Sequence, residues 1–187
     1  MVYLDRLYTR SGDGGQTGLG DGSRVAKSHP RIAVIGAVDE LNCALGVALS
    51  HPELPAGIRD ALAGVQNDLF DLGADLAVPL AREAQAPLRI TEEQIAELER
   101  RIDAGTKSLT PLTSFILPGG TPVAAALHLA RAICRRAEVA MVHLTEAEPA
   151  NPRALAYLNR LSDLLFALAR LANDGGKSDV LWRPGGG

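Results

Sequence analysis

The segment 8–31, YTRSGDGGQTGLGDGSRVAKSHPR, contains the residue types that bind a polyphosphate. Its six glycines let backbone N–H groups converge on anionic oxygens, because no side chain blocks the approach. Hydroxyl and cationic side chains would add donors and positive charge: Thr9, Ser11, Thr17, Arg10 and Lys27, with Arg24 and Arg31 as further cations. The same composition is typical of a disordered leader. The segment therefore predicts either a mobile leader or a loop that a phosphate-rich ligand orders.

A second polar set lies farther along the chain, in a stretch with helical spacing. His128, Arg131, Arg135 and Glu138 advance by three, four and three residues, which places them on one face of a helix. Two arginines four residues apart repel each other by roughly a few tenths of a kcal/mol, and an anion facing them would reverse the sign. The alternative is a solvated face, or arginines paired with carboxylates of another helix.

Two further stretches carry polar residues among apolar ones. They are Asn159, Asp163, Phe166 and Arg170 beside a leucine stripe, and, nearer the start of the chain, Asp39 and Asn42. The structural interpretation of Asp39 is a partner for an arginine within the bundle, and this interpretation is compatible with a functional role. Gly36 and Gly46 lie on the same predicted helix as Asp39 and weaken it by about 1 kcal/mol each relative to alanine. We therefore expect another backbone or a ligand to approach them closely.

Several common catalytic patterns are absent from the sequence. There is no P-loop pattern GxxxxGK[ST], no Rossmann turn and no Gly-x-Ser-x-Gly motif. Ferritin-like di-iron bundles carry Glu-x-x-His, whereas Glu138 and His143 are five residues apart. The sequence predicts no metal ligand among the side chains.

The elements that must position these residues are helices. The 187 residues suit one domain, and 47% hydrophobic with only 4% aromatic residues favours helices over a β-sandwich. Apolar spacing predicts five helices, at 31–49, at 56–78, and from caps at Thr91 (a capping box with Gln94), Thr121 and Asn151. The predicted fold is all-α, an antiparallel five-helix bundle at 31–175 with a glycine-rich N-terminal loop at 1–30 and a tail at 176–187, of which we expect WRPGGG at 182–187 to be mobile.

Charge and cysteine content narrow the class of protein. The net charge of −3 offers no overall field for nucleic acid. Cys43 and Cys134 show no CxxC spacing, so we expect two buried, reduced thiols in a cytoplasmic protein. The first residues lack the basic-then-apolar pattern of an export signal, and we expect no membrane span.

Five motifs occur in one order along the chain: YTRSGDGGQT at 8–17, VDELN at 38–42, FILPGG at 115–120, RAICRRAE at 131–138 and NRLSDLLF at 159–166. Together they resemble the PduO-type ATP:cob(I)alamin adenosyltransferases, and the resemblance extends from about residue 8 to residue 170. It implies a homotrimer with ATP and the corrinoid at the subunit interfaces. It also implies transfer of the 5′-deoxyadenosyl group of ATP to the cobalt of cob(I)alamin, with release of triphosphate.

The resemblance also implies roles for particular residues. The nucleotide would be bound by Thr9, Arg10, Ser11, Gly12, Thr17, Gly18 and Lys27 of one subunit and by Arg135, Glu138 and Asn159 of a neighbour, with Mg²⁺ accompanying the phosphates. The catalytic set would be Asp39, Arg131 and Phe115: Asp39 paired with Arg131 across the interface, and Phe115 at the lower face of cobalt. Val139 stands where the family often has another arginine, and Ser11 stands where it usually has threonine.

Two alternatives stay open at this point. The same trimer would serve, without catalysis, as a carrier that binds adenosylcobalamin and delivers it to a mutase. A third class is a structural bundle with a disordered leader, which would leave the polar residues of the two helix faces without a purpose. A reductase that supplies cob(I)alamin and a mutase that receives the product are expected partners of the enzyme. We further expect the leader to fold around the phosphates when ATP binds.

Overall fold

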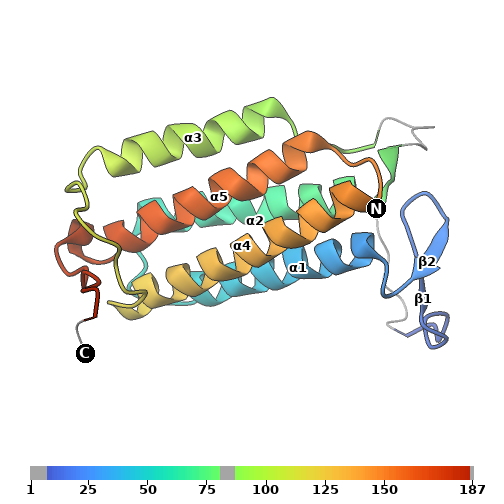
Figure 1. The fold of residues 1–187 in the computed structure, drawn as a ribbon, viewed down its shortest axis with the longest axis horizontal. Coiled ribbons are helices and arrows are strands. Elements are labelled where there is room, and N and C mark those ends of the chain that lie inside the picture. The colour runs from blue at the N-terminus through green and yellow to red at the C-terminus, as the bar shows by residue number, and fades with distance from the viewer. Residues whose placement is uncertain (1–7, 81–86, 186–187) are drawn as a thin grey trace.

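Five helices form the body of the protein in a computed structural model that describes residues 8–80 and 87–185 (Figure 1). The helices are α1 (Pro30–Leu49), α2 (Ala56–Ala77), α3 (Glu92–Thr106), α4 (Pro122–Ala147) and α5 (Pro152–Leu171). Helices that follow one another in the chain run in opposite directions where they pack, as α1 and α2 or α4 and α5 do (Figure 1). The five predicted helices are confirmed. Residues 81–86, between α2 and α3, lie outside the described residues.

The predicted caps explain where three helices begin. The Thr91 hydroxyl accepts from the Gln94 N–H at 3.4 Å, and Gln94 Oε1 accepts from the Thr91 N–H at 3.0 Å, which completes the capping box. The Thr121 and Asn151 side chains accept from backbone N–H groups at 3.1 Å in each case, and a proline follows each of them.

The core is built from the apolar stripes of the helices. α4 packs between α1 and α5, α2 covers α1, and α3 covers α5. Leucines dominate the interior, among them Leu41, Leu45, Leu62, Leu72, Leu158, Leu161 and Leu165, and all of these are fully buried. Burying one leucine side chain contributes about 2 kcal/mol, so these stripes hold the helices in fixed positions. The bundle therefore presents its remaining helix faces as a rigid scaffold.

One expectation about α1 needs correction. Cys134 on α4 is buried as predicted, but Cys43 on α1 is exposed. Among the described residues no backbone lies close to Gly36 or Gly46: Gly36 has open space around it, and a Cβ at Gly46 would lie 3.7 Å from Gln66 Nε2. Approach of a ligand or of another protomer to these glycines stays a prediction. α1 is also long and apolar enough for a membrane span by length and mean hydropathy alone.

A membrane span does not fit the packing of α1. The helix carries Asp39 and Glu40 at its middle, and its other side, at Val34, Val38 and Leu41, is buried in the bundle. These are properties of a core helix with one open face.

The N-terminal loop contains a small antiparallel hairpin that the sequence did not predict. β1 (Gln16–Gly18) pairs with β2 (Arg24–Ala26), with Thr17 opposite Val25. The hairpin lies beside the beginning of α1, at the end of the bundle opposite the C-terminal segment (Figure 1). It contacts the bundle through a 2.8 Å hydrogen bond from the Gly20 N–H to the Ala77 carbonyl.

The C-terminal segment is also more structured than predicted. After α5, a 3₁₀ turn (Asp174–Gly176) reverses the chain, and Leu181 forms an antiparallel bridge with Ile116. The expectation of a free tail was wrong at Trp182, whose N–H donates to the Phe115 carbonyl at 2.7 Å. The tail thereby supports the loop that precedes α4.

Candidate active site

The leader gathers part of the predicted nucleotide set. Thr9 Oγ1 and Ser11 Oγ share a hydrogen bond of 2.7 Å, and a Cβ built on Gly12 would lie 3.1 Å from Lys27 Nζ. The Lys27 ammonium therefore lies over the Gly12 backbone, and the Lys27 N–H donates to the Gly15 carbonyl at 2.8 Å. Hydroxyls, glycine backbone and a cation thus lie close together, which is the donor set that phosphate oxygens require.

Arg10 and the strand residues complete this part of the site. Arg10 is exposed, adopts a left-handed backbone conformation with φ of 59°, and its guanidinium carbon lies 5.9 Å from the centroid of the Tyr8 ring. A positive φ is uncommon for a residue with a side chain, and such strain is frequent at ligand-binding turns. Thr17 and Gly18 lie on β1, on the strand that follows the Ser11–Gly15 turn.

Two cations of the leader have internal partners. Arg24 Nη2 donates to the Ser11 carbonyl at 2.7 Å, which braces the turn. Arg31 is buried, and its Nε lies 2.8 Å from Glu148 Oε1. The expectation that Arg31 supplies charge to a phosphate is therefore wrong, because a carboxylate of the same protomer already neutralises it.

The predicted polar face of α4 is present and is cationic. The Arg131 guanidinium carbon lies 5.8 Å from the centroid of the Phe166 ring, and the His128 ring meets the edge of the same ring at 6.1 Å. Among the described residues, Arg131 Nε and His128 Nδ1 are buried without a hydrogen-bond partner. Unpaired buried donors are costly, so this face is suited to receive an acceptor from outside the protomer.

The pKa shifts of Arg131 and His128 agree with a buried, cationic face on α4. Burial and then the neighbouring Arg135 lower the pKa of Arg131. Burial and then the Arg131 charge lower the pKa of His128, which favours a neutral imidazole. Within the described part of the chain no carboxylate forms an ion pair with Arg131 or Arg135. Asp39 likewise forms no ion pair with an arginine in the described part of its own protomer, so the interpretation of Asp39 as an arginine partner within the bundle has no support there.

The carboxylates Asp39 and Glu40 on α1 and Glu138 on α4 form no ion pair with Arg131 or Arg135 in the described part of the chain. Asp39 is exposed on the open face of α1, whereas the adjacent Glu40 forms an ion pair with Arg136. Glu138 Oε1 accepts from Asn159 Nδ2 at 2.7 Å, and Arg160 Nη1 donates to Asn159 Oδ1 at 2.9 Å. Glu138 and Asn159 thus lie together as predicted, on the rim of a depression of about 370 Å³ between α4 and α5.

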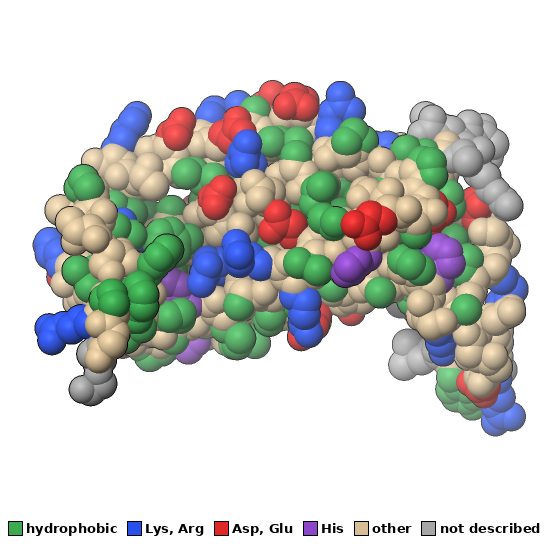
Figure 2. All heavy atoms as spheres, viewed as in Figure 1, with side chains coloured by type: hydrophobic (Ala, Val, Ile, Leu, Met, Phe, Trp, Pro, Cys, Tyr) green, Lys and Arg blue, Asp and Glu red, His purple; other side chains and the backbone are tan. Residues whose placement is uncertain are grey.

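Phe115 lies at the other end of the protomer from the leader. Its side chain is 77% exposed, which is unusual for phenylalanine, and its ring centroid is 6.1 Å from that of Trp182. An open groove of about 950 Å³ borders it, lined by Ser114, Leu117, Asp179, Val180, Leu181 and Trp182 among others. Figure 2 shows hydrophobic side chains gathered at this end, with basic side chains beside them toward the middle of the molecule.

The structure therefore divides the predicted site into two groups. Thr9 to Lys27 lie at one end of the bundle, and Phe115 lies at the opposite end, with the polar face of α4 between the two ends (Figure 1). Sequence reasoning missed the contact of Trp182 with Phe115. The signal available for it was the single tryptophan of the chain, which lies in a segment otherwise typical of a tail.

The donors available near the leader bear on the expected Mg²⁺. In the described residues no group of three or more His, Cys, Asp or Glu side chains is arranged to hold a metal ion. Hydroxyls, backbone N–H groups and cations fit an ion that is bound by the phosphates rather than by the protein.

Comparisons with known proteins agree with the five motifs. The sequence model of the family described as cobalamin adenosyltransferase matches residues 7–172. A cobalamin adenosyltransferase from Cupriavidus metallidurans is 50% identical over 181 residues, which cover 96% of this chain and 95% of that protein. A corrinoid adenosyltransferase from Mycobacterium tuberculosis is 50% identical over 190 residues, which cover 99% and 96%.

Solved structures give the same result. A phenylalanine-to-alanine variant of the PduO-type ATP:corrinoid adenosyltransferase from Lactobacillus reuteri, complexed with cobalamin and ATP, superposes with a TM-score of 0.89. It is 40% identical, and the match covers 95% of this chain and 99% of that one. Because the family match extends over most of the chain and two relatives are half identical over nearly their whole length, the chain belongs to the cobalamin adenosyltransferase family.

Proposed function

We propose that this protein transfers the 5′-deoxyadenosyl group of ATP to the cobalt of cob(I)alamin, giving adenosylcobalamin and triphosphate. Family membership supports the reaction, as does a relative of the same fold whose solved structure holds cobalamin and ATP. The observation that carries the assignment within this chain is the cationic face of α4. Arg131 and Arg135 share it without an ion-paired carboxylate among the described residues, and a triphosphate would supply the missing negative charge.

The assembly that fits this chemistry is a homotrimer. The leader and the segment before α4, which carries Phe115, lie at opposite ends of one protomer (Figure 1), so a single chain does not bring its own leader to its own cobalt-facing residue. A cyclic assembly would place the leader of one protomer against α4 of the next and would repeat that contact three times. In the same contact, exposed Asp39 of one protomer would reach Arg131 of its neighbour.

The reaction needs no nucleophilic side chain, because cobalt(I) is itself the nucleophile. Its electron pair forms the new bond to C5′ of the ribose, the C5′–O bond breaks, and the triphosphate leaves with the electron pair of the broken C5′–O bond. Thr9, Ser11, Gly12, Thr17 and Gly18 would hold the nucleotide, with Glu138 and Asn159 completing the pocket from the neighbour. Holding C5′ in line with cobalt is a positioning effect.

Cationic side chains would stabilise the charge that accumulates on the triphosphate. Arg10 and Lys27 on the leader and Arg135 on α4 suit this role, because their positive charge is in place before the reaction begins. Mg²⁺ bound to the phosphates would neutralise a further part of that charge. Val139, which is exposed one residue after Glu138, adds no cation there.

Phe115 would make the cobalt reducible. Its exposed ring, next to Trp182, offers an apolar surface on which the lower face of the corrin would lie. Such a surface excludes water and the lower axial base, which favours a four-coordinate cobalt and its reduction to cobalt(I). We place the reaction in the cytoplasm, where the two free cysteines would stay reduced and where a reductase and a mutase would act before and after it.

One assay tests the proposed reaction. Under anaerobic conditions the protein is mixed with Mg-ATP and chemically reduced cob(I)alamin, and both the absorbance of adenosylcobalamin and the free triphosphate are measured. We expect equal amounts of the two products and no inorganic phosphate or diphosphate. Binding of both substrates without formation of a cobalt–carbon bond would instead identify a carrier of adenosylcobalamin.

A further inference from the structure

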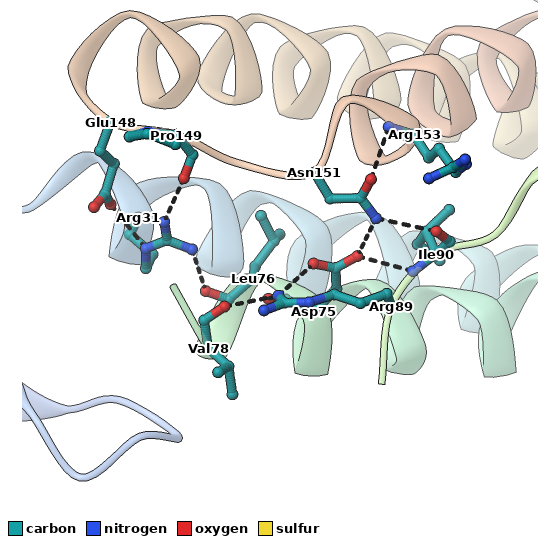
Figure 3. Close-up of polar contacts among 10 residues, drawn as sticks. All are labelled: Arg31, Asp75, Leu76, Val78, Arg89, Ile90, Glu148, Pro149, Asn151 and Arg153. Atoms are coloured by element: carbon teal, nitrogen blue, oxygen red, sulfur yellow. Dashed lines mark hydrogen bonds and ion pairs between the residues drawn. The ribbon is translucent and has the colours of Figure 1, made fainter. Parts of the chain in front are cut away.

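The C-terminal end of α2 is held by three segments that are distant in the sequence. The last carbonyl groups of a helix lack partners within it, and they carry the negative end of its dipole. Arg31 Nη1 donates to the Leu76 carbonyl at 2.7 Å, and the Gly20 N–H donates to the Ala77 carbonyl at 2.8 Å. Arg89 Nη1 donates to the Asp75 carbonyl at 2.6 Å and to the Val78 carbonyl at 2.7 Å. Figure 3 shows the two arginines converging on this helix end.

The buried Asp75 carboxylate makes this helix end rigid. Asp75 Oδ2 accepts from the Ile90 N–H at 2.8 Å and from Asn151 Nδ2 at 2.7 Å, and Asp75 Oδ1 lies 2.8 Å from Arg89 Nη1 (Figure 3). Asn151 also caps α5, so the end of α2 and the beginning of α5 share one polar network. A network in which these donors and acceptors are matched resists displacement.

Gly20 lies in the turn between β1 and β2 and provides the hairpin's hydrogen bond to this helix end. A Cβ built on Gly20 would lie 3.0 Å from Val78 Cγ2 and 3.2 Å from the Ala77 carbonyl oxygen. The hairpin turn therefore approaches the end of α2 so closely that an added Cβ would force a shift of a few tenths of an ångström. Glycine suits this position because it has no side chain to displace the turn.

Arg31 holds the other end of the leader to the same place. It is the second residue of α1, directly after the leader, and it is 2% exposed. Its Nη1 donates to the Leu76 carbonyl, adjacent to the Ala77 carbonyl that receives Gly20, and Glu148 neutralises its charge. The hairpin is thus fixed at its turn and at its exit, on two consecutive carbonyl groups of α2.

We propose that this helix end is an anchor that sets the position of the nucleotide-binding hairpin over the bundle, and that Gly20 and Arg31 are positioning residues for ATP. The inference rests on the proposed function, in which the hairpin contributes half of the nucleotide pocket and the neighbouring protomer contributes the other half. Neither residue would touch ATP. Displacing the hairpin by a few tenths of an ångström would weaken its phosphate contacts, because the second half of the pocket does not move with it.

The test compares Gly20→Ala with a matched control, Gly73→Ala, at a glycine of α2 where an added Cβ meets nothing. For Gly20→Ala we expect faster amide exchange over residues 16–26 without ATP and a KM for Mg-ATP raised about three- to tenfold, the size of one lost hydrogen bond. We expect kcat at saturating Mg-ATP, the KM for cob(I)alamin and the thermal midpoint of Gly20→Ala to stay near those of the unaltered protein. Gly73→Ala should match the unaltered protein in all kinetic constants and raise the thermal midpoint slightly, because alanine stabilises a helix relative to glycine.

Two results would overturn the anchor. One is an unchanged KM for Mg-ATP in Gly20→Ala, with or without faster exchange of the hairpin. The other is an equal loss of affinity for both substrates with a lower thermal midpoint, which is the behaviour of a purely structural residue. Failure of the proposed function itself is separate, because then the unaltered protein would neither bind Mg-ATP nor form adenosylcobalamin.

Discussion

The N–H of Trp182 donates a 2.7 Å hydrogen bond to the carbonyl of Phe115, and their ring centroids lie 6.1 Å apart. A second hydrogen bond, from the Leu117 N–H to the Val180 carbonyl at 2.8 Å, continues the pairing on the other side of Ile116. The loop before α4 is therefore held in shape by the C-terminal segment. This arrangement keeps an aromatic ring exposed, against the usual tendency of phenylalanine to be buried.

Phe115→Ala should separate reduction from transfer. With the ring removed, the lower axial ligand would remain on cob(II)alamin and resist formation of cobalt(I), whereas preformed cob(I)alamin has no such ligand to lose. We expect a rate loss at least about tenfold larger when the assay starts from cob(II)alamin and reductant than when it starts from cob(I)alamin.

Phe70→Ala on α2 is the matched control, because Phe70 is another exposed phenylalanine, remote in the fold from the Phe115 loop. It should leave both rates near those of the unaltered protein. Equal losses from both starting states in Phe115→Ala would refute the role assigned to the ring.

Arg131→Ala and Asp39→Ala should both impair turnover with preformed cob(I)alamin. The first removes a cation from the α4 face, and we expect a loss of about 100-fold or more in kcat/KM. The second removes the proposed partner of Arg131 in the neighbouring protomer, and it should weaken the trimer or raise the KM for cob(I)alamin.

The two substitutions act on one interaction, so the double variant should lose less than the product of the two single losses. Arg100→Ala on α3 serves as the control, since Arg100 is exposed and, among residues 8–80 and 87–185, forms ion pairs only with Glu93 and Glu97 of its own helix. Near-normal turnover in both single variants would show that these residues are wrongly assigned.

Mg-ATP should protect the leader. Residues 8–15 connect to the hairpin through few hydrogen bonds, and their hydroxyls and glycine N–H groups would gain phosphate partners on binding. We expect proteolysis and amide exchange over residues 8–31 to slow at saturating Mg-ATP, while exchange in the cores of α2 and α5 stays the same. Sensitivity that does not change with Mg-ATP would contradict a nucleotide-binding leader.

Asp75→Ala should destabilise the bundle more than any surface carboxylate does. It leaves the Ile90 N–H and the Asn151 amide without their buried acceptor and removes the partner of Arg89 at the Asp75 side chain. Losing one partner of a buried charged network lowers the free energy of unfolding by about 3–5 kcal/mol. Chemical denaturation measures it, with exposed Asp103→Ala on α3 as a control expected within about 0.5 kcal/mol of the parent. A loss below about 1 kcal/mol for Asp75→Ala would contradict the buried network.

The helices followed from local signals, and several site features did not. Capping at Thr91, Thr121 and Asn151 is decided within three residues, so the sequence alone predicts it. The hairpin has strands of three residues, which is too short for a recognisable alternation, and the Leu181–Ile116 bridge joins residues 65 positions apart.

The sequence identifies charged side chains more easily than it identifies the residues that pair with them. The sequence marks Arg31 as a cation near a glycine-rich loop, but only packing shows that Glu148, more than a hundred residues later, neutralises it. For Arg131 the spacing correctly predicts a shared face with His128, because helix periodicity alone determines it. The proposed pairing of Asp39 with Arg131 of a neighbouring protomer depends on assembly, and no spacing within one chain encodes it.

The central claim is that the leader of one protomer and the polar face of α4 of its neighbour form one active site. It is tested most directly by mixing two inactive variants, Lys27→Ala in the leader and Arg135→Ala on α4. The two variants carry different tags and are coexpressed in equal amounts. Trimers that carry both tags are isolated, and their activity is compared with that of trimers made of each variant alone. In a closed trimer that carries both tags, one of the three junctions joins an intact leader to an intact α4 face, so mixed trimers should recover about one third of the parent rate. Mixed trimers no more active than either variant alone would contradict a site shared between protomers.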